Sequence, residues 1–260
     1  MAFDLAVVIQ TVCRPTVVRS LDSIFKQTHP GPLQVLIGVD KGMDDTLIRE
    51  FIRANRPPHV VCNIINLGFS NATAQGGVYS NAFGGSLRTS LTFLANSKYV
   101  AFLDDEDWWD PGHVADILAA LQKADWAYAF RNYVNSANNE VIAQDRWESV
   151  GPGQGFFNER FGGFVCCSAL ALNKITLAPL LHLFCFAMFP TGDGEDRQFL
   201  HGLFKSGAKG AATNRASVMC AVNPGDKMHA RRLQWWEQSG YDVSKIPTQA
   251  YPRGTDFRPA

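Results

Sequence analysis

Residues 98–110, KYVAFLDDEDWWD, join a short apolar run to four consecutive acidic residues and two tryptophans. The apolar run indicates a buried strand over residues 98–103. The four acids, Asp104 to Asp107, begin where that strand ends. In open parallel sheets, ligands bind outside the carboxyl ends of the strands. This stretch therefore predicts a sheet strand together with a candidate binding site at its end.

The chain on both sides of this stretch alternates between two kinds of segment. Short β-branched apolar runs predict strands, and segments with apolar residues at helical spacing predict helices between them. Strands are expected over 5–11, 33–39 and 60–65, and helices from Val17 to Phe25, over 45–54, along Leu87, Leu91 and Leu94, and from Val114 to Leu121. Strands that alternate with helices of this length imply βαβ units and a parallel sheet.

The second half of the chain continues this pattern less regularly. Residues 126–134 and 164–172 predict two further strands, which we expect to extend the same sheet. Residues 66–85 are rich in Gly, Asn and Ser and predict a loop whose length is typical of functional segments. The chain is therefore expected to fold as a single α/β domain with a mostly parallel central sheet flanked by helices.

The composition narrows the classes of partner. The 260 residues carry 24 Lys and Arg against 24 Asp and Glu. This balance argues against binding of nucleic acid through a positive net charge of the whole protein.

The most apolar window, 177–189, is too short for a bilayer span and contains His182, so it predicts core or a surface-seeking helix. No transmembrane segment is expected, although peripheral membrane contact stays open. No signal-peptide pattern and no C-x-x-C pair occur, and we expect a cytoplasmic protein.

The acidic run has two interpretations. Adjacent carboxylates at a strand end suit Mg²⁺ or Mn²⁺, which prefer hard oxygen ligands and share their shell with substrate phosphates. Such an ion would neutralise a leaving diphosphate as a Lewis acid. Alternatively, the acids form a solvated turn ahead of the helix that follows Pro111. Asp40 also comes just after a predicted strand, at 33–39, and its position favours a binding site.

Two longer blocks resemble a known family. VVIQTVCRPTVVRSLDSIFKQTHPGPLQVLIGVDKGMDDT, from residue 7, and GGSLRTSLTFLANSKYVAFLDDEDWWDPGHV, from residue 84, resemble family 2 glycosyltransferases of the GT-A fold. The resemblance implies a Rossmann-like α/β domain and an inverting enzyme that uses a nucleotide sugar. It further implies that residues 1–125 form the donor-binding half and residues 126–260 the acceptor-binding half with the C-terminal segment.

The resemblance implies specific roles at the nucleotide. Thr11 and Arg14 would border the nucleotide pocket, and Asp40 would accept a hydrogen bond from the base, most plausibly N3–H of uracil. Arg88 would lie over the base or the phosphates, and Asp104, with its neighbour Asp105, would serve the ribose or a metal-bound water. Two of these residues have structural alternatives, because Asp40 would also suit the cap of a turn and Arg88 a structural ion pair.

The same resemblance implies a metal site with one departure from the family pattern. If Asp104 is the first Asp of the D-x-D motif, Glu106 stands at the metal position, where the family has Asp. The Glu106 side chain is longer than Asp by one methylene, so either the ion would shift or Asp105 or Asp107 would replace Glu106 as the metal ligand. His229, in GDKMHARR (225–232), would be a late metal ligand, with Arg231 or Arg232 on the diphosphate. An ordinary surface histidine is the alternative.

The segment PTGDGEDRQF (190–199) resembles the family's Glu-Asp pair at a helix start. In inverting members, a carboxylate there removes the proton from the acceptor hydroxyl, which requires a base opposite the leaving nucleotide. Asp196 is expected to be that base, and Glu195 is the second choice. The alternative is an acidic first turn that stabilises the helix dipole. Trp108 and Trp109 are expected either to stack on the sugar or acceptor or to pack the sheet edge.

Together these features predict a metal-dependent, inverting glycosyltransferase of the hexosyl type. It would move a sugar from a nucleotide diphosphate sugar, most plausibly a UDP-sugar, to a hydroxyl of a glycan, glycolipid or small-molecule acceptor. Bacterial-type polysaccharide or glycoconjugate synthesis would be the setting. Two alternatives stay open: a non-catalytic nucleotide- or sugar-binding protein and a nucleotidyltransferase. TVCRPT (11–16) counts against the second, because it is not a Gly-rich, basic phosphate loop.

Overall fold

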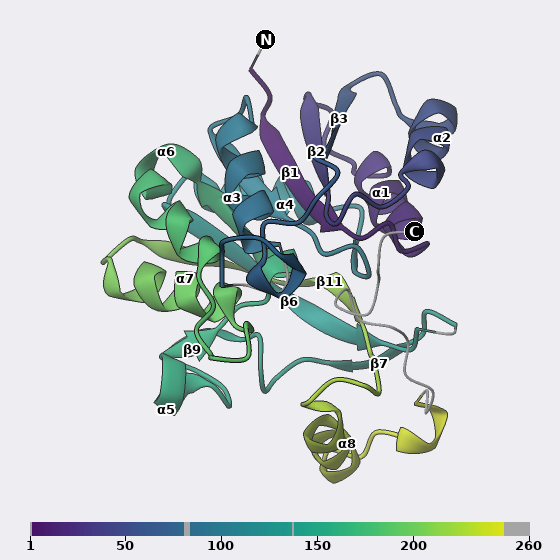
Figure 1. Cartoon of the computed structure of the whole chain (residues 1–260). Coiled ribbons are helices and arrows are strands. Elements are labelled where there is room, and N and C mark those ends of the chain that lie inside the picture. Colours follow the sequence, from purple (N-terminus) through teal and green to yellow (C-terminus); the bar gives the residue numbers. More distant parts are fainter. Residues whose placement is uncertain (1, 81–83, 137, 247–260) are drawn as a thin grey trace.

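The computed structural model describes residues 2–80, 84–136 and 138–246. Its main feature is a nine-stranded sheet in the order β3-β2-β1-β4-β10-β6-β11-β5, with β7 paired to β6 at the side (Figure 1). The strands in that order are β3 (Val60–Asn66), β2 (Leu33–Val39), β1 (Leu5–Thr11), β4 (Tyr99–Phe102), β10 (Leu170–Asn173), β6 (Trp126–Val134), β11 (Gly210–Ala221), β5 (Trp108–Trp109) and β7 (Val141–Gln144).

The sheet is mostly parallel, as expected. β1 pairs in parallel with β2 and β4, β2 with β3, and β6 with β11. β10 runs antiparallel between β4 and β6, and β5 and β7 are antiparallel edge additions. The second half of the chain thus extends the sheet of the first half. The predicted single α/β domain is confirmed.

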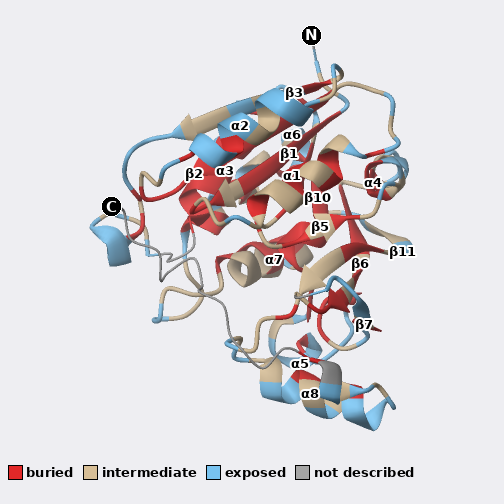
Figure 2. Cartoon of the chain, turned by 90° about the vertical axis from the view of Figure 1, so that its right-hand side faces the viewer, coloured by how far each residue is buried: buried red, intermediate tan, exposed pale blue. Residues whose placement is uncertain are grey.

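Helices cover the sheet. α3 (Gly85–Leu94) packs on β1, β2 and the 3-10 helix η3 (Ala178–Cys185), while α4 (His113–Leu121) packs on β6, β10 and β11. The remaining helices are α1 (Val17–Phe25), α2 (Thr46–Asn55), α5 (Asn158–Phe161), α6 (Lys174–Leu177), α7 (Glu195–Lys205) and α8 (His229–Gln238), with 3-10 turns η1 (Thr73–Gln75), η2 (Cys167–Ala169) and η4 (Val243–Lys245). Figure 2 shows the buried strands enclosed by helices with exposed outer faces.

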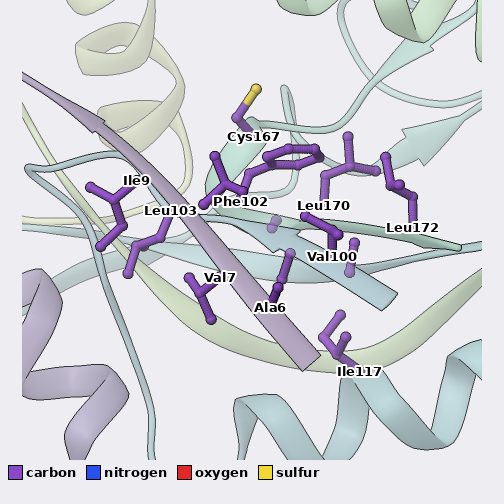
Figure 3. Close-up of a cluster of buried hydrophobic side chains, with 14 of the residues drawn as sticks. Ala6, Val7, Ile9, Val100, Phe102, Leu103, Ile117, Cys167, Leu170 and Leu172 are labelled. Atoms are coloured by element: carbon purple, nitrogen blue, oxygen red, sulfur yellow. The ribbon is translucent and has the colours of Figure 1, made fainter. Parts of the chain in front are cut away.

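The core explains why these runs form strands. All residues of β2, and all of β1 except Gln10, are buried, as continuous apolar runs in parallel sheets require. In Figure 3, Val100, Phe102, Leu170 and Leu172 lie side by side on one face of the central strands. The Phe184 ring of η3 covers this face, 5.4 Å from Phe102 between ring centroids. Within the apolar window 177–189, Leu177, Leu181, Phe184 and Cys185 are buried in the core, whereas His182 and Phe186 are exposed.

Two local predictions are wrong. Leu94, the last residue of α3, is 60% exposed and does not share the buried face of Leu87 and Leu91. α3 lies between the sheet and η3, so Arg88, Thr89 and Thr92 complete its buried surface instead.

Residues 164–172 are not one strand. β9 (Gly163–Phe164) pairs with β8 (Gly151–Pro152) in a small second sheet, and the turn η2 precedes β10. The turn brings Ser168 to the acidic segment, where its hydroxyl donates to Asp107. A continuous strand would lack the bend that makes this contact.

The C-terminal part builds a smaller core of its own. Trp236 of α8 is fully buried against Tyr133 of β6, with Ala143, Val222 and Ile246 in the same cluster. Figure 1 shows α8 beside β7, away from the helices that flank the sheet. Within the described residues, no helix is long and apolar enough to cross a membrane.

Candidate active site

A cleft of about 400 Å³ lies at the carboxyl ends of the central parallel strands. Thr11 and Arg14 line it at the end of β1, Asp40 follows β2, and the acids 104–107 follow β4. Because β1, β2 and β4 run in parallel, their carboxyl ends meet at one edge of the sheet. Asp40 and the acidic run, 64 residues apart at their nearest, thus share one cleft.

Arg14 holds two of the four acids. It forms ion pairs with both Asp105 and Glu106, and Thr11 Oγ1 donates a 2.6 Å hydrogen bond to Asp105 Oδ2. Asp105 is 1% exposed, so its charge is compensated from within the protein. The Thr-x-x-Arg turn after β1 therefore supports the acidic run directly.

The other two acids point to different partners. Asp104 accepts a 3.0 Å hydrogen bond from Arg88, and buried Asp107 accepts from the Ser168 hydroxyl at 2.6 Å and the Ala221 amide at 3.3 Å. Burial, reinforced by the charge of Asp104, raises the pKa of Asp107 to about 6. The four neighbouring acids thus diverge instead of converging on one point.

This divergence limits the metal site. Among the described residues, no group of three or more His, Cys, Asp or Glu side chains is placed to hold an ion. Asp104 and Glu106 line the cleft and keep 34% and 30% of their side chains exposed. Burial raises the pKa of Glu106 well above its usual value, against the opposing charge of Arg14. The donor set fits an ion that takes one or two carboxylates and completes its shell with water and substrate phosphates.

His229 does not join this group. It begins α8 and does not line the cleft, and burial together with the charge of Arg232 lowers its pKa. The four-acid and histidine cluster expected from the sequence is thus not assembled in the described part of the chain.

Arg88 connects the strand-end acids to the second acidic pair. Its guanidinium is buried, 3.0 Å from Asp104 and 3.8 Å from Glu195. The rings of Phe102 and Phe184 lie 5.9 and 5.4 Å from its Cζ atom. Arg88 is therefore a structural ion-pair partner that also lines the cleft.

Glu195 and Asp196 begin α7 and line the same cleft. Gly194, at a φ of 87°, supplies the left-handed turn that starts this helix. Burial and the charge of Asp196 raise the pKa of Glu195 to about 7, while Arg88 opposes the shift. Burial also raises the pKa of Asp196. The carboxyl of Glu195 therefore titrates near neutral pH beside Asp196, and the pair can accept a proton there.

The basic residues of the C-terminal segment are differently placed. Arg232 lines the cleft, but it donates to both carboxylate oxygens of Glu148 at 2.8 Å and to Asp226 at 2.9 Å. These contacts occupy all three of its nitrogens. Arg231 is exposed and packs over Phe156, outside the cleft.

The sequence interpretation missed a buried charge network in the wall of the cleft. Arg131 of β6 donates at 2.8 Å to both Asp145 and Glu148, and Glu148 also binds Arg232. Arg131 stands within the apolar run 126–134, and a charge at such a position is the one signal that points to a buried partner.

Trp108 and Trp109 pack the sheet edge. Both pair with β11 as strand β5, and neither lines the cleft. The Arg19 guanidinium stacks 3.7 Å above Trp108. Trp109 is buried, donates to the Ser168 carbonyl at 2.7 Å and stacks on His113. Of the two interpretations of these tryptophans, their positions agree with packing.

Comparison with known proteins gives one family match and several relatives. The model of Glycosyl transferase family 2 matches residues 6–178, more than half of the chain. Among curated proteins, the chain is 20% identical over 216 residues to UDP-Glc:alpha-D-GlcNAc-diphosphoundecaprenol beta-1,3-glucosyltransferase WfaP of Escherichia coli, covering 82% of this chain and 74% of WfaP.

Solved structures share the fold. TarS 1–349 of S. aureus, in complex with UDP-GlcNAc, matches with a TM-score of 0.57 and 14% identity over 93% of this chain and 68% of TarS 1–349. The mannosyltransferase PcManGT of Pyrobaculum calidifontis, in complex with GDP-Man and Mn²⁺, matches with a TM-score of 0.56 and 14% identity over 90% of this chain and 61% of PcManGT.

Proposed function

The chain belongs to glycosyl transferase family 2 and is a glycosyltransferase, and from this premise we propose that it moves a hexose from a UDP-sugar to an acceptor hydroxyl with inversion. One observation carries the proposal: Asp40, the 104–107 acids and the Glu195–Asp196 pair all line a single cleft. A donor and an acceptor can therefore meet there.

The donor would lie at the strand-end side of the cleft. Asp40 is 8% exposed and can accept a hydrogen bond from a base, and Thr11 and Arg14 border the same space. A UDP-sugar is preferred because uracil offers the N3–H donor that a carboxylate accepts. Two similar proteins support a UDP-sugar donor: the name of WfaP contains UDP-Glc, and TarS 1–349 is in complex with UDP-GlcNAc. PcManGT differs, because it is in complex with GDP-Man.

Asp104 and Glu106 would hold Mn²⁺ or Mg²⁺, which supplies Lewis-acid stabilisation of the leaving diphosphate when bound. PcManGT is bound to Mn²⁺, which agrees with such an ion. Arg14 positions Glu106 through its ion pair, and Arg88 positions Asp104. The chain itself thus fixes the two carboxylates that face the donor.

Asp196 would remove the proton from the acceptor hydroxyl. Glu195, which contacts Arg88, would share one proton with Asp196, so that Asp196 would be fully ionised only above about pH 7, the pKa to which burial raises Glu195. A base on the face opposite the leaving nucleotide leads to inversion at the anomeric carbon. The acceptor is proposed to be a glycan or glycolipid, as for WfaP, whose name gives a diphosphoundecaprenol-linked acceptor. We place the reaction in the cytoplasm.

The test is calorimetric titration of the wild-type protein with UDP and GDP, with Mn²⁺, with Mg²⁺ and with EDTA. The expected result is UDP binding that is stronger with metal and stronger than GDP binding. Nuclear magnetic resonance of the product then gives the anomeric configuration. Absent nucleotide binding under all these conditions would refute the proposal, and retained configuration in the product would refute inversion.

A further inference from the structure

Arg197, the residue after Asp196, lies among four phenylalanine rings. Its Cζ atom is 4.4 Å from the ring centroid of Phe157, 5.2 Å from that of Phe161, 5.6 Å from that of Phe164 and 5.7 Å from that of Phe189. Arg197 is half-buried and lines the cleft together with Phe157 and Phe164. We call these four rings and the guanidinium the Arg197 cage.

The guanidinium of Arg197 differs from the other arginines of the cleft. Arg14, Arg88, Arg131 and Arg232 each form ion pairs with carboxylates. Within the described ranges, no carboxylate or hydrogen-bond acceptor pairs with the Arg197 guanidinium. Aromatic faces hold a cation in place through the ring quadrupole but do not neutralise it. Against the effect of burial, the charge of Arg197 lowers the pKa of the neighbouring Asp196 carboxyl, but the cage keeps its planar donor group in position at the cleft without a direct ion pair.

The cage stands on the acceptor side of the cleft. Arg197 follows the proposed base directly, and Phe157 and Phe164 come from the second half of the chain. The donor-side residues Thr11, Arg14 and Asp40 follow strands of the first half. Phe189 of the cage does not line the cleft but lines a second cavity of about 600 Å³, between segments 73–80 and 187–192.

Building on the proposed function, we propose that Arg197 binds an anionic group of the acceptor, a phosphate or a carboxylate, next to the hydroxyl that Asp196 deprotonates. Guanidinium groups bind both anions bidentately, which would orient the acceptor as well as hold it. The phenylalanine walls suit an anion attached to an apolar or sugar moiety. The substrate class is thus an acidic acceptor.

The experiment uses calorimetry on the 260-residue chain saturated with UDP and Mn²⁺, so that the donor site is filled. The probes are octyl phosphate, octanoate and inorganic phosphate, with octyl glucoside as the uncharged control. The variants are Arg197→Gln and the matched control Arg160→Gln. Arg160 also lies over the Phe161 and Phe189 rings, but it is exposed and does not line the cleft.

We expect octyl phosphate or octanoate to bind the wild type, and Arg197→Gln to weaken that binding by at least about tenfold. Arg160→Gln should bind within about twofold of the wild type. Inorganic phosphate binding weakly through Arg197 would also support the proposal and show that the anion alone is recognised. The proposal is overturned if neither amphiphile binds, if Arg197→Gln binds them as the wild type does, or if octyl glucoside binds equally well. The UDP titration of the wild type reports separately on the proposed function.

Discussion

Arg88 of α3 lies between Asp104 of the strand-end acids and Glu195 of the α7 pair, at 3.0 and 3.8 Å. One buried cation thus ties the two halves of the cleft together. Removing it would leave charge on both sides without compensation.

The variant Arg88→Met should therefore destabilise the protein by about 3 kcal/mol, the scale for breaking a buried ion pair. Urea denaturation measures this loss as a lower midpoint. Arg49→Met is the matched control, because Arg49 also pairs with an aspartate but is exposed, and its midpoint should stay near that of the wild type. Equal midpoints for the two variants would show that Arg88 has no such bridging role.

Asp40→Asn should weaken UDP binding by about 10- to 100-fold, because a hydrogen bond to a charged group contributes about 1.5–3 kcal/mol. Isothermal titration with UDP and Mn²⁺ measures the change. Asp22→Asn is the control, since Asp22 pairs with Lys26 on the surface of α1 outside the cleft. If Asp40→Asn bound UDP as tightly as this control, Asp40 would have a structural role only.

The pH profile of the transfer rate should have an acidic limb, a decrease of the rate at low pH, that is set by the Glu195–Asp196 pair. Burial and the charge of Asp196 raise the pKa of Glu195 to about 7, the proposed shared proton delays full ionisation of Asp196 to that pH, and the base must be ionised to act. The rate should therefore rise with pH through about 7. In Glu195→Gln the neighbouring charge is gone, so the pKa of Asp196 should fall and the limb should move to lower pH.

Asp196→Asn should lower the transfer rate by about 10²- to 10⁴-fold, the usual contribution of a general base. Rates with saturating donor and acceptor between pH 5 and 9 would test both variants. An unmoved limb in Glu195→Gln, or full transfer by Asp196→Asn, would assign the base elsewhere.

Glu148→Gln should detach the C-terminal segment from the sheet. Glu148 binds Arg131 of β6 and Arg232 of α8 at once, so the variant takes one of two carboxylate partners from each buried arginine and leaves Asp145 and Asp226 in place. The expected cost is about 3 kcal/mol, the lower end of the range for breaking a buried ion pair. Hydrogen exchange of α8, with the exposed Glu237→Gln as control, would show whether α8 opens selectively. Exchange in α8 that matches the control would contradict this linking role.

The same buried charge network should make the stability of the fold sensitive to acid. Burial alone would raise the pKa of Asp145, but Arg131 and three backbone N–H groups lower it below its usual value. A carboxyl with a lowered folded-state pKa stabilises the fold above its unfolded pKa and loses that contribution as the pH falls through its folded pKa. The urea midpoint of unfolding of the wild type should therefore decrease as the pH falls below about 4. The midpoint of Asp145→Asn should decrease less steeply over the same range.

The sequence by itself determined the alternation of strands and helices along the chain from β1 to β6 and the positions of Asp40 and the acidic run at strand ends. These follow from hydrophobic periodicity, which is local, and from the rule that parallel strands share a carboxyl edge. The start of a helix at Glu195 and Asp196 came instead from the resemblance to the family's Glu-Asp pair, and α7 begins at Glu195.

Only the tertiary structure decided which charges meet. Arg14 binds Asp105 and Glu106, Arg232 binds Glu148 across 84 residues, and Arg197 lies among phenylalanines without a carboxylate. Such partners are chosen by the packing of distant segments, and the direction of a side chain has no signature in local periodicity. For that reason the four adjacent acids, which the sequence suggested as one metal cluster, have different partners in the fold. Asp105 and Glu106 pair with Arg14, Asp104 pairs with Arg88, and Asp107 accepts a hydrogen bond from Ser168.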